Sequence, residues 1–396
     1  MLNLLTKSLS IEIQNFVAHI QGECGVNNFK SFTKSAFVQC RKKIQPDVFK
    51  KLSALLVDEF YTDNELGIKL WNGFRVLAVD GSTLTLPFTK ELKTIYGLTK
   101  NQTKTGVVQA RVSVLYDVLN NYVLEGLLSA KQTGERALAL KHLIKSKIKD
   151  LIIYDRGYPS YDFIHEHCIR SIDYLMRVKV SFSATTLAFI ASGKYSEVVE
   201  IYPGKNVPLS DKVYDRNTPI KVRLIRIDLP SGQTELLITS LLNSKQYPKK
   251  IFKALYFKRW KVETFYDELK NKLKVEYFSG YSNQTILQDF NAALFISNVQ
   301  TLIVNDLQDE IKELTKDRKL DYKVNTNLSY GFLKNKIITL LFSNKEKDIE
   351  NLVNQLKIVF KKELVPIRPN RTYQRNIGKY HRRKKPKITK NQKDTI

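Results

Sequence analysis

The sequence predicts an α/β protein, and three stretches of it carry that prediction. Two apolar runs, Val76–Val79 and Leu151–Tyr154, each stop at an aspartate that a glycine follows within two residues. That pattern is typical of a buried strand that ends in a turn. The third stretch, from Pro248 to about Phe278, has the residue spacing of a long helix, and one apolar face of it should pack against a core. Strands and a helix that both need a partner surface indicate a sheet covered by helices.

The predicted helix places four polar side chains on one face, beside the face that packs. Arg259, Glu263 and Lys270 follow Tyr256 by three, seven and fourteen residues. At ~100° per residue, the four side chains fall within roughly 60° of one another. A hydroxyl, a guanidinium, a carboxylate and an ammonium in a row suit a metal ion beside a phosphate. The alternative is a solvated charged face. The neighbouring apolar stripe consists of Val262, Tyr266, Leu269 and Leu273.

Asp80 and Asp155 follow the two predicted strands directly. Ligands of open α/β sheets bind beyond the carboxyl ends of the strands, so these two carboxylates and Glu263 predict a divalent-metal site. Carboxylate oxygens suit Mg²⁺ or Mn²⁺, and two ions about 3.5–4 Å apart can serve the attacking and leaving oxygens of a phosphodiester. We assign Asp80 as the bridging ligand, Asp155 to one ion and Glu263 to the other.

The composition indicates a globular protein with a polyanionic partner. The formal net charge is +26 over 396 residues, and the hydrophobic fraction of 43% excludes a disordered basic protein. The length allows two or three domains. Three scattered cysteines without a CxxC pair argue for reduced thiols in the cytosol and against structural zinc. We expect neither a signal peptide nor a membrane span, because no stretch approaches ~18 apolar residues.

Residues 1–71 are predicted to form a helical domain. Spaced apolar residues recur there with few helix breakers, and Thr33 or Ser35 is a candidate cap for the middle helix. The far end of that helix is basic, with Arg41, Lys42 and Lys43. The basic end is either a nucleic-acid contact or the charged rim of an ordinary bundle.

Residues 72–180 are predicted to form most of the core. The strand that brings Asp80 continues through Leu84, and VVQARVSVLYDV and YVLEGLLSA form a hairpin. A helix from Glu135 to about Ile148 precedes the strand of Asp155, and a second helix precedes a strand within 171–180. Three antiparallel strands followed by alternating helix and strand is the order of a ribonuclease-H-like fold.

The remaining segments complete the predicted architecture. Residues 181–246 are a β-rich insertion, with EVVEIYP, KVRLIRIDL, a turn at Pro230-Ser231-Gly232, and ELLITSLL. Residues 247–280 hold the helix of Glu263, residues 281–365 form a C-terminal helical region, and residues 366–396 are a basic tail. The tail has the composition of a solvated, disordered segment that binds phosphates without sequence preference.

Several other residues compete for functional roles. His165, His167 and Cys168 have the composition of a metal site, but their helical offsets do not converge on one ion. Asp267 is an alternative third carboxylate, and Glu135 is an alternative helix carboxylate of the ribonuclease type. We expect both tryptophans, Trp71 and Trp260, to be packing residues.

The aspartates Asp80 and Asp155, with Tyr256-x2-Arg259-x3-Glu263-x6-Lys270, resemble the DDE-type transposases of bacterial insertion sequences. The match is to the cut-and-paste branch with the Tyr-Arg-Glu-Lys motif, and it extends from about Ser31 to about Lys385. This resemblance implies an enzyme that binds the terminal inverted repeats of its own element, cleaves the DNA ends and joins them to target DNA. The alternatives are a metal-dependent nuclease without strand transfer and a non-catalytic DNA-binding descendant.

The resemblance also implies partners and a location. Double-stranded DNA is the expected partner, at the element ends and at the target, with a homodimer in the synaptic complex and an N-terminal domain that grips the inverted repeat. No organic cofactor and no membrane are expected, and the place of action is the bacterial cytoplasm, on the nucleoid.

Phosphate-binding roles follow from the helix face and from the resemblance. Arg259 and Lys270 should contact the phosphates beside the scissile bond, and Tyr256 should donate to a nearby phosphate. Two further candidates, Arg177 and Lys179, alternate along one predicted strand. The last, Arg156, is either a phosphate contact or a structural ion-pair donor.

Relatives by motif form a hairpin at the element end, and in some an aromatic of the insertion stacks on a flipped base. Glu235 stands here where that aromatic is expected, and an acid repels DNA. Phe182 and Tyr214 are the candidates for its replacement, and the alternative is that every aromatic of the insertion packs between strands.

Overall fold

The computed structural model describes residues 9–63, 67–100, 106–205, 207–210, 212–229, 232–343 and 345–368. The chain forms two compact units. The sheet unit comprises Glu65–Ser82 and Arg111–Phe265, as far as these are described. The helical unit comprises the described parts of Met1–Asn64, Thr83–Ala110 and Tyr266–Ile396. The predicted N-terminal and C-terminal helical regions therefore belong to one unit.

A large mixed sheet organises the sheet unit, as the α/β prediction requires. Its strands are β1 (Arg75–Thr85), β3 (Val107–Asp117), β4 (Val123–Ala130), β5 (Asp150–Tyr154), β6 (Asp173–Val178), β7 (Ser196–Ile201), β8 (Ile220–Asp228) and β9 (Thr234–Thr239). They lie in the order β4-β3-β1-β5-β6-β9-β8-β7. Strands β1, β5 and β6 run parallel, and β6, β9, β8 and β7 run antiparallel. The two apolar runs predicted as strands are β1 and β5.

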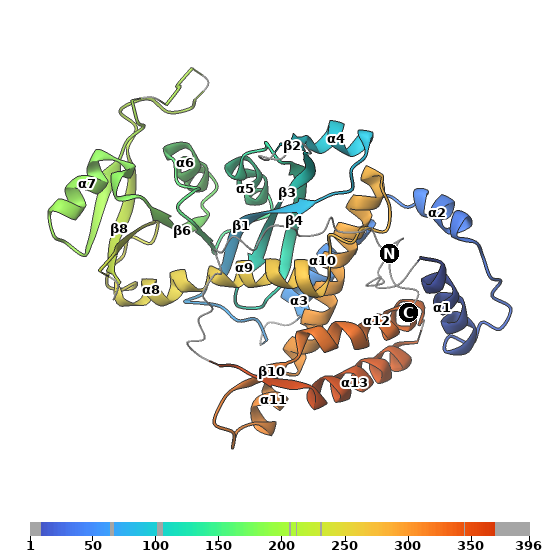
Figure 1. Ribbon diagram of the computed structural model, residues 1–396. Helices are drawn as coiled ribbons and strands as arrows, with labels where there is room; N and C mark the ends of the chain where they lie inside the picture. Colours follow the sequence, from blue (N-terminus) through green and yellow to red (C-terminus); the bar gives the residue numbers. More distant parts are fainter. Residues whose placement is uncertain are drawn as a thin grey trace. The chain divides into compact units, whose positions relative to one another are not determined.

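Helices cover this sheet because its central strands are apolar on both faces, as the full burial of Val76–Val79 in β1 and of β5 shows. The helices of the sheet unit are α5 (Glu135–Leu143), α6 (Tyr161–Ile169), α7 (Ala184–Ala191), α8 (Lys250–Phe257) and α9 (Trp260–Asp267). Ala139 of α5 and Phe163 of α6 share a buried cluster with Leu77 and Ile152 of the strands. Figure 1 shows α8 and α9 on the opposite side of these strands, nearly end to end. Helix α5 ends at Leu143, earlier than predicted.

The predicted insertion is less separate than its sequence suggests. Its three strands β7, β8 and β9 extend the main sheet, since β9 pairs antiparallel with β6. It also begins with a 3₁₀ turn (Val180–Phe182) and with α7, which the β-rich reading missed. The missed signal is a capping box, in which the side chains of Ser183 and Thr186 each accept from the other's backbone N–H. Pro230 and Ser231 of the predicted turn lie outside the described residues.

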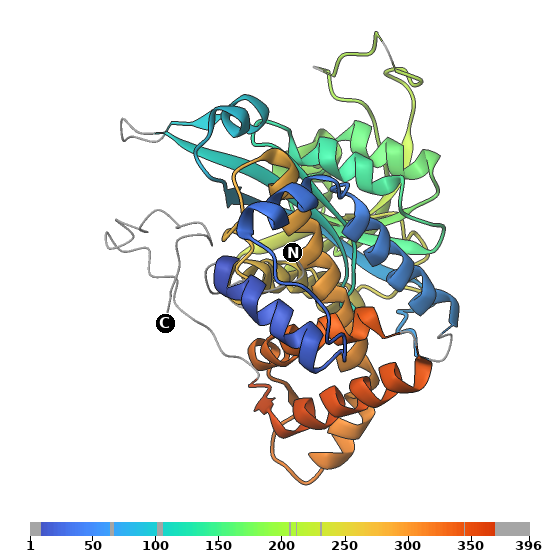
Figure 2. The same cartoon turned by 90° about the vertical axis from the view of Figure 1, so that its right-hand side faces the viewer.

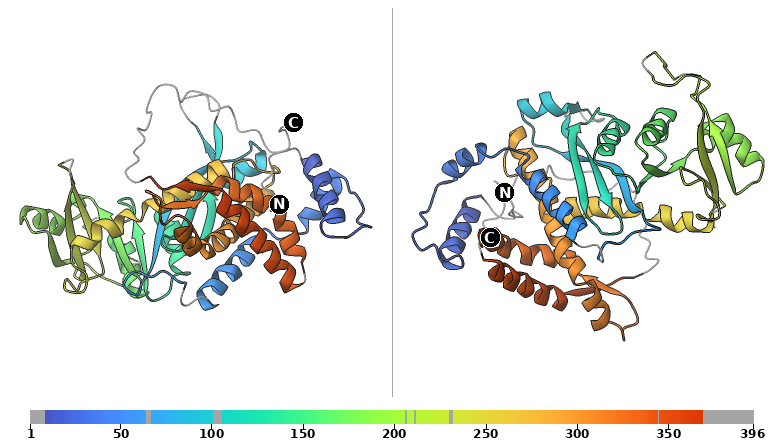
Figure 3. Two further views of the ribbon diagram at one scale, coloured as in Figure 1. Left: turned by 90° about the horizontal axis from the view of Figure 1, so that it is seen from below. Right: turned by 180° about the vertical axis from the view of Figure 1, so that it is seen from behind.

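The helical unit has a core of its own. Its elements are α1 (Leu9–Gly22), α2 (Lys34–Lys42), α3 (Val48–Asp63), α4 (Lys90–Tyr96), β2 (Leu98–Thr99), the π-helical turn η2 (Glu268–Lys272), α10 (Asn283–Asp306), α11 (Gln308–Leu314), β10 (Tyr322–Val324), α12 (Thr326–Phe342), α13 (Glu346–Lys362) and β11 (Leu364–Pro366). Helix α3 packs on α10, where the rings of Phe49 and Phe295 stack 6.4 Å apart. Figures 2 and 3 show α12 and α13 side by side. Among the described helices, none is long and apolar enough to cross a membrane.

Thr33 caps α2, as predicted, by accepting a hydrogen bond from the Ala36 N–H. The basic end of α2 divides into two kinds of residue. Arg41 is buried, and its guanidinium donates to Gln288, Ser279 and Asp289, all in or next to α10. Lys42 and Lys43 are exposed. Arg41 therefore docks α2 onto α10, and only the two lysines remain candidates for contact with a polyanion.

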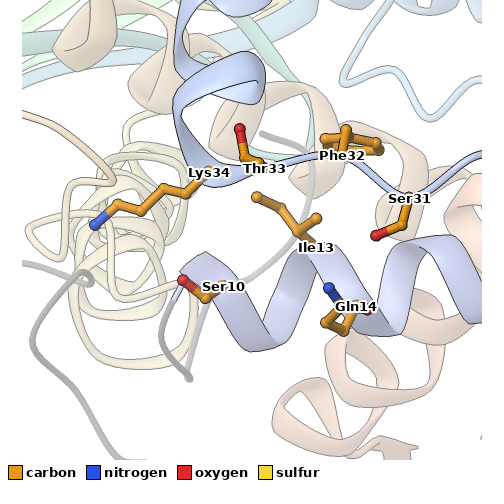
Figure 4. Close-up of a pocket in the computed structure, with 7 residues that line it drawn as sticks. All are labelled: Ser10, Ile13, Gln14, Ser31, Phe32, Thr33 and Lys34. Atoms are coloured by element: carbon orange, nitrogen blue, oxygen red, sulfur yellow. The ribbon is translucent and has the colours of Figure 1, made fainter.

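A cavity of about 340 Å³ lies between α1 and the segment that leads into α2 (Figure 4). Ser10, Ile13 and Gln14 line it from α1, and Ser31, Phe32, Thr33 and Lys34 line it from the other side. The cavity belongs to the helical unit, whereas the predicted carboxylates belong to the sheet unit. It is therefore not the predicted metal site.

Candidate functional site

The strand register brings the two predicted aspartates to the same level. Strands β1 and β5 are parallel neighbours, and Ala78 pairs with Ile153. Asp80 and Asp155 each follow two residues later, so both stand at the same level of adjacent strands, which lie about 4.8 Å apart. Asp155 directly follows β5, whereas β1 continues through Asp80 to Thr85, so the predicted turn after Asp80 is wrong. Both strands are fully buried up to that level, because Val76–Val79 and Leu151–Tyr154 have no exposed surface. Buried apolar strands thus deliver two carboxylates to one place.

The predicted helix of residues 248–278 is not continuous, which corrects the sequence-based expectation. Helix α8 ends at Phe257 and α9 begins at Trp260. At this junction the backbone N–H of Arg259 donates to the Tyr256 carbonyl, and that of Val262 donates to the Arg259 carbonyl. These hydrogen bonds join residues three apart in the sequence, whereas α-helical bonds join residues four apart. In such a 3₁₀-like turn, the side chains of residues i and i+3 are aligned. Tyr256 and Arg259 therefore lie on one side of the junction, with the guanidinium 6.0 Å from the tyrosine ring.

Arg259 links two of the predicted carboxylates. Its Nη2 donates to Glu263 Oε1 at 2.7 Å, and its Nη1 lies 3.5 Å from Asp80 Oδ2. The guanidinium is nearly buried, and among the described residues its buried Nε has no hydrogen-bond partner. The third carboxylate, Asp155, accepts a hydrogen bond of 3.3 Å from the Tyr256 hydroxyl. The structure thus brings five predicted residues together: two aspartates from the sheet, and a tyrosine, an arginine and a glutamate from α8 and α9.

The electrostatics of this group follow from burial and from its own charges. Burial raises the pKa of Asp80 to about 6, the nearby carboxylates of Glu263 and Glu135 act in the same direction, and Arg259 and the Gly81 N–H oppose them. Burial also raises the pKa of the Tyr256 hydroxyl. Burial works against the charge of Arg259, but the hydrogen bond to Glu263 and the surrounding acids raise its pKa overall. The group therefore attracts positive charge.

Two observations bear on a metal ion at this site. Within the described residues, no three acidic, histidine or cysteine side chains lie close enough together to hold one. The carboxylates of Asp80 and Glu263 are instead bridged by the guanidinium of Arg259. The donor chemistry nevertheless fits a hard divalent cation, because the set consists of carboxylate oxygens at the edge of a buried sheet. The position between Asp80 and Glu263 already accommodates a cation, in the form of Arg259.

The other predicted phosphate contacts are distributed differently. Arg177 on β6 forms an ion pair of 3.1 Å with Glu235 on β9, so the acid that was expected to repel DNA is paired with a cation. Arg156 and Lys179 are exposed. Lys270 lies in the π-helical turn η2, in the helical unit. Lys270 was predicted on the same face as Tyr256, Arg259 and Glu263 because one regular helix was assumed. The α8–α9 junction and the π-helical turn both depart from regular α-helical geometry.

A fourth carboxylate lies beside Asp80. Glu135, at the start of α5, forms an ion pair with Arg111 of β3. A Cβ atom on Gly81 would lie 3.0 Å from a carboxylate oxygen of Glu135, so β1 passes close to this side chain at Gly81. The Tyr158 hydroxyl is buried and has no hydrogen-bond partner in the part of the chain that the structure describes. The charges of Asp80, Glu135 and Asp155 add to the burial that raises its pKa. Sequence analysis considered Glu135, but Arg111 and Tyr158 were missed, because their proximity depends on the fold.

Most of the other residues considered for functional roles pack inside the protein. His167 is fully buried and stacks edge-on against Tyr154. Tyr214 is 8% exposed and packs against Tyr161 and His165, while Phe182 packs against the core of the sheet unit. Tyr214 is therefore buried, and Phe182 is partly buried. Trp71 stacks on Tyr247, as predicted. Trp260 differs from its prediction, because the residue is 44% exposed, and its ring lies 5.0 Å from the Arg259 guanidinium.

Comparisons with known proteins place this geometry in a family. No curated protein sequence matches the chain. A solved structure, the cryo-EM synaptic complex of piggyBac transposase with hairpin DNA, is similar over 71% of this chain and 57% of the other, with a TM-score of 0.37 and 10% sequence identity. The chain thus spans little more than half the length of that protein. The family described as Transposase DDE domain matches residues 71–299, which contain both aspartates and the whole of α8 and α9. Because this match covers more than half of its length, the chain belongs to the family of transposases with a DDE domain.

Proposed function

We propose that this protein binds the terminal inverted repeats of its own insertion sequence, cleaves the DNA ends and joins them to target DNA by strand transfer. The proposal assigns it to the cut-and-paste branch with the Tyr-Arg-Glu-Lys motif. Family membership supports a DNA transposase. The observation that carries the finer proposal is the contact of Arg259 with Asp80 and Glu263, next to the contact of Tyr256 with Asp155. Three of the motif's four side chains thus lie together with the two aspartates beside a buried sheet.

In this proposal Asp80, Asp155 and Glu263 hold Mg²⁺ or Mn²⁺, as two ions. Asp80 would serve both ions, and Asp155 and Glu263 would each serve one. Divalent ions supply charge stabilisation for the attacking and leaving oxygens of the phosphodiester. The chain's own contribution is a carboxylate set held rigidly, since the strands behind Asp80 and Asp155 are fully buried. Glu263 also orients the attacking water.

The cationic and hydroxyl groups position the DNA. Arg259 presents a planar fork of donors that matches a phosphate, and the raised pKa of the buried Tyr256 hydroxyl keeps it protonated as a donor. Lys270, Arg156, Arg177 and Lys179 are further phosphate contacts in this proposal. Phosphates near the carboxylates need this compensation, because Asp80, Glu263 and Asp155 otherwise repel the DNA backbone.

The partners follow from the same function. The protein acts on double-stranded DNA, at the element ends and at the target, as a homodimer in the synaptic complex, in the bacterial cytoplasm on the nucleoid. The N-terminal helices α1–α3 contact the inverted repeat. The net charge of +26 suits a polyanion of this kind.

The decisive experiment incubates purified protein with a plasmid that carries its gene and the natural flanking DNA, in Mg²⁺, in Mn²⁺ or with a chelator. We expect divalent-metal-dependent cleavage at the element ends, followed by joined products. Asp80→Asn, Asp155→Asn and Glu263→Gln should each reduce cleavage at least about a hundredfold and leave DNA binding intact, because they remove stabilisation of the reacting oxygens. Asp267→Asn is the matched control, an exposed acid on α9.

Each other result has a definite meaning. Cleavage without joined products assigns the protein as a nuclease, and end binding without cleavage in either metal assigns it as a non-catalytic descendant. Arg259→Ala and Lys270→Ala separate DNA positioning from chemistry. Each should weaken end binding and lower the slope of log affinity against log salt by about one. An altered metal requirement with an unchanged slope would reverse these roles.

A further inference from the structure

One exposed tyrosine of the insertion gathers two cations. Tyr195, just before β7, is 48% exposed. The ammonium of Lys249 lies 3.9 Å from the centroid of its ring, and the guanidinium of Arg226 on β8 lies 5.6 Å from it. The ring face is electron-rich and attracts cations. The Tyr195 ring therefore holds two positive charges close together, although the two charges repel each other.

Helix α8 continues this positive surface. Lys249 precedes the helix directly, and Lys250 and Lys253 are exposed on it, whereas Phe252, Leu255 and Tyr256 are its buried residues. None of the three lysines has a carboxylate partner in the part of the chain that the structure describes. Asp228 at this surface pairs with Arg226 at 2.8 Å. Three uncompensated positive charges remain along one side of the helix start.

The three lysines and the Tyr256–Asp155 contact lie along the same stretch of chain. Tyr256, whose hydroxyl donates to Asp155, is seven residues beyond Lys249 on the same helix. A helix rises 1.5 Å per residue, so along the axis Lys249 lies about 10 Å from Tyr256, Lys250 about 9 Å and Lys253 about 4.5 Å. A DNA backbone that leaves the carboxylates along α8 meets Lys253 first and then Lys250 and Lys249.

We propose that this lysine–tyrosine surface, made of Tyr195, Arg226, Lys249, Lys250 and Lys253, binds the sugar–phosphate backbone of duplex DNA next to the strand held at the carboxylates. The proposal rests on the proposed function. Lysine and arginine contact phosphates without reading sequence. The ring face of Tyr195 is covered by a cation, so the tyrosine organises the charges and does not stack on a base. The contact is therefore to the backbone and independent of sequence.

The test measures binding of the full-length protein to a labelled duplex of random sequence by fluorescence anisotropy, over a series of salt concentrations. Lys249→Ala should weaken binding about threefold to tenfold and lower the salt slope by about one. Tyr195→Ala should weaken binding about threefold, because the ring no longer holds the two cations, whereas Tyr195→Phe keeps the ring and should bind like wild type.

Tyr202→Ala is the matched control. Tyr202 lies in the same insertion and is also 48% exposed, but its hydroxyl donates to Glu200 and it holds no cation. It should bind DNA like wild type. The surface is refuted if Lys249→Ala and Tyr195→Ala both bind like wild type, or if Tyr202→Ala loses as much affinity as they do. Because Lys249 is exposed, its substitution tests the surface without disturbing the fold. Wild-type protein that binds no DNA even at low salt would refute the proposed function itself, and this surface with it.

Discussion

Arg259 contacts one carboxylate that is close in sequence and one that is remote. Glu263 follows it by four residues, and Asp80 precedes it by 179 residues. The first contact is visible in the sequence, because side chains four apart share a helix face. The second depends on how β1 packs against the helix. The guanidinium lies between the two acids, so their like charges are compensated inside the protein.

Three buried residues show why contact geometry alone does not define a catalytic site. Ser113 lies 3.0 Å from Nε2 of His142, whose Nδ1 lies 2.8 Å from Glu125. This is the contact order of a hydrolytic triad. Ser113 and His142 have no exposed surface, however, so no substrate reaches the hydroxyl. The three residues instead tie α5 to β3 and β4.

His167 belongs to a motif that resembles a metal site and is instead a neutral core residue. Its Nδ1 lies 3.1 Å from the Ile172 carbonyl, and its Nε2 lies 3.1 Å from the Tyr154 hydroxyl. The carbonyl only accepts, so Nδ1 donates to it, and Nε2 of the neutral ring accepts from Tyr154. Burial lowers the pKa of His167 to about 4.

This low pKa predicts a loss of stability in mild acid. Between pH of about 6.5 and about 4, the unfolded chain binds a proton at His167 that the folded protein does not, so stability falls as the pH falls. The full effect is up to about 3 kcal/mol. Urea unfolding at a series of pH values measures it. His167→Gln, which cannot titrate, should be less stable at neutral pH and should show a flatter pH dependence over this range. An unchanged slope would contradict the assignment.

At the scale of elements, the junction between α8 and α9 sets the site. Regular α-helical geometry would place Tyr256 and Arg259 about 60° apart, whereas the tighter turn brings them into line. The predicted apolar stripe nevertheless holds, since Val262, Tyr266, Leu269 and Leu273 are all buried. The apolar stripe therefore packs as predicted although the helix changes type. The polar side chains of the neighbouring face do not keep their predicted angular spacing.

Helix α10 shows a second relation between elements. Its polar side chains hold the backbone that connects α2 to α3. Gln284 donates to the carbonyls of Lys42 and Ile44, Gln288 donates to the Ile44 carbonyl, and Asn291 donates to the Pro46 carbonyl. Arg41 completes the contact through its ion pair with Asp289, at 2.9 Å. Polar bonds as well as apolar packing therefore fix α2 to α10.

Loss of Arg41 should disrupt this docking. Arg41→Ala leaves the buried carboxylate of Asp289 without its cation, and removal of one partner of a buried pair costs about 3–5 kcal/mol. Lys42→Ala, its exposed neighbour, should change stability by less than about 0.5 kcal/mol. Thermal unfolding of both variants beside wild type measures the difference. Equal losses for the two would show that Arg41 has no special structural role.

At the scale of the whole molecule, the charge of +26 is spread over both units and the C-terminal end of the chain. The sequence from Arg368 onward is strongly basic, and residues 369–396 lie outside the described residues. Its composition suits contact with phosphates of any DNA sequence. We expect this tail to add general affinity and no specificity for the element ends.

Deletion of residues 369–396 tests this expectation. The shortened protein should bind all duplexes more weakly to the same degree, with a shallower dependence on salt, because fewer phosphates are neutralised. The measurement compares affinities for a duplex with the element end and for a random duplex. A loss of end preference with unchanged affinity for random DNA would assign the tail to recognition of the ends instead.

The sequence by itself determined the features that arise from local pattern. The apolar runs before Asp80 and Asp155 predicted β1 and β5, and the β-prone residues and turn residues of the insertion predicted β7, β8 and β9. The spacing from Tyr256 to Glu263 predicted their common side of the helix. Strand and helix periods are properties of neighbouring residues, so they can be read without a fold.

Only the tertiary structure decided which of these features meet. The register of β1 on β5 aligns the two aspartates, and the packing of α9 sets Arg259 against Asp80. The same packing buries Arg41 and Tyr214, which the sequence offered as surface groups, and exposes Trp260, which it offered as core. These outcomes depend on contacts between residues far apart in the chain, and the energy of such a contact depends on burial, which local sequence does not determine.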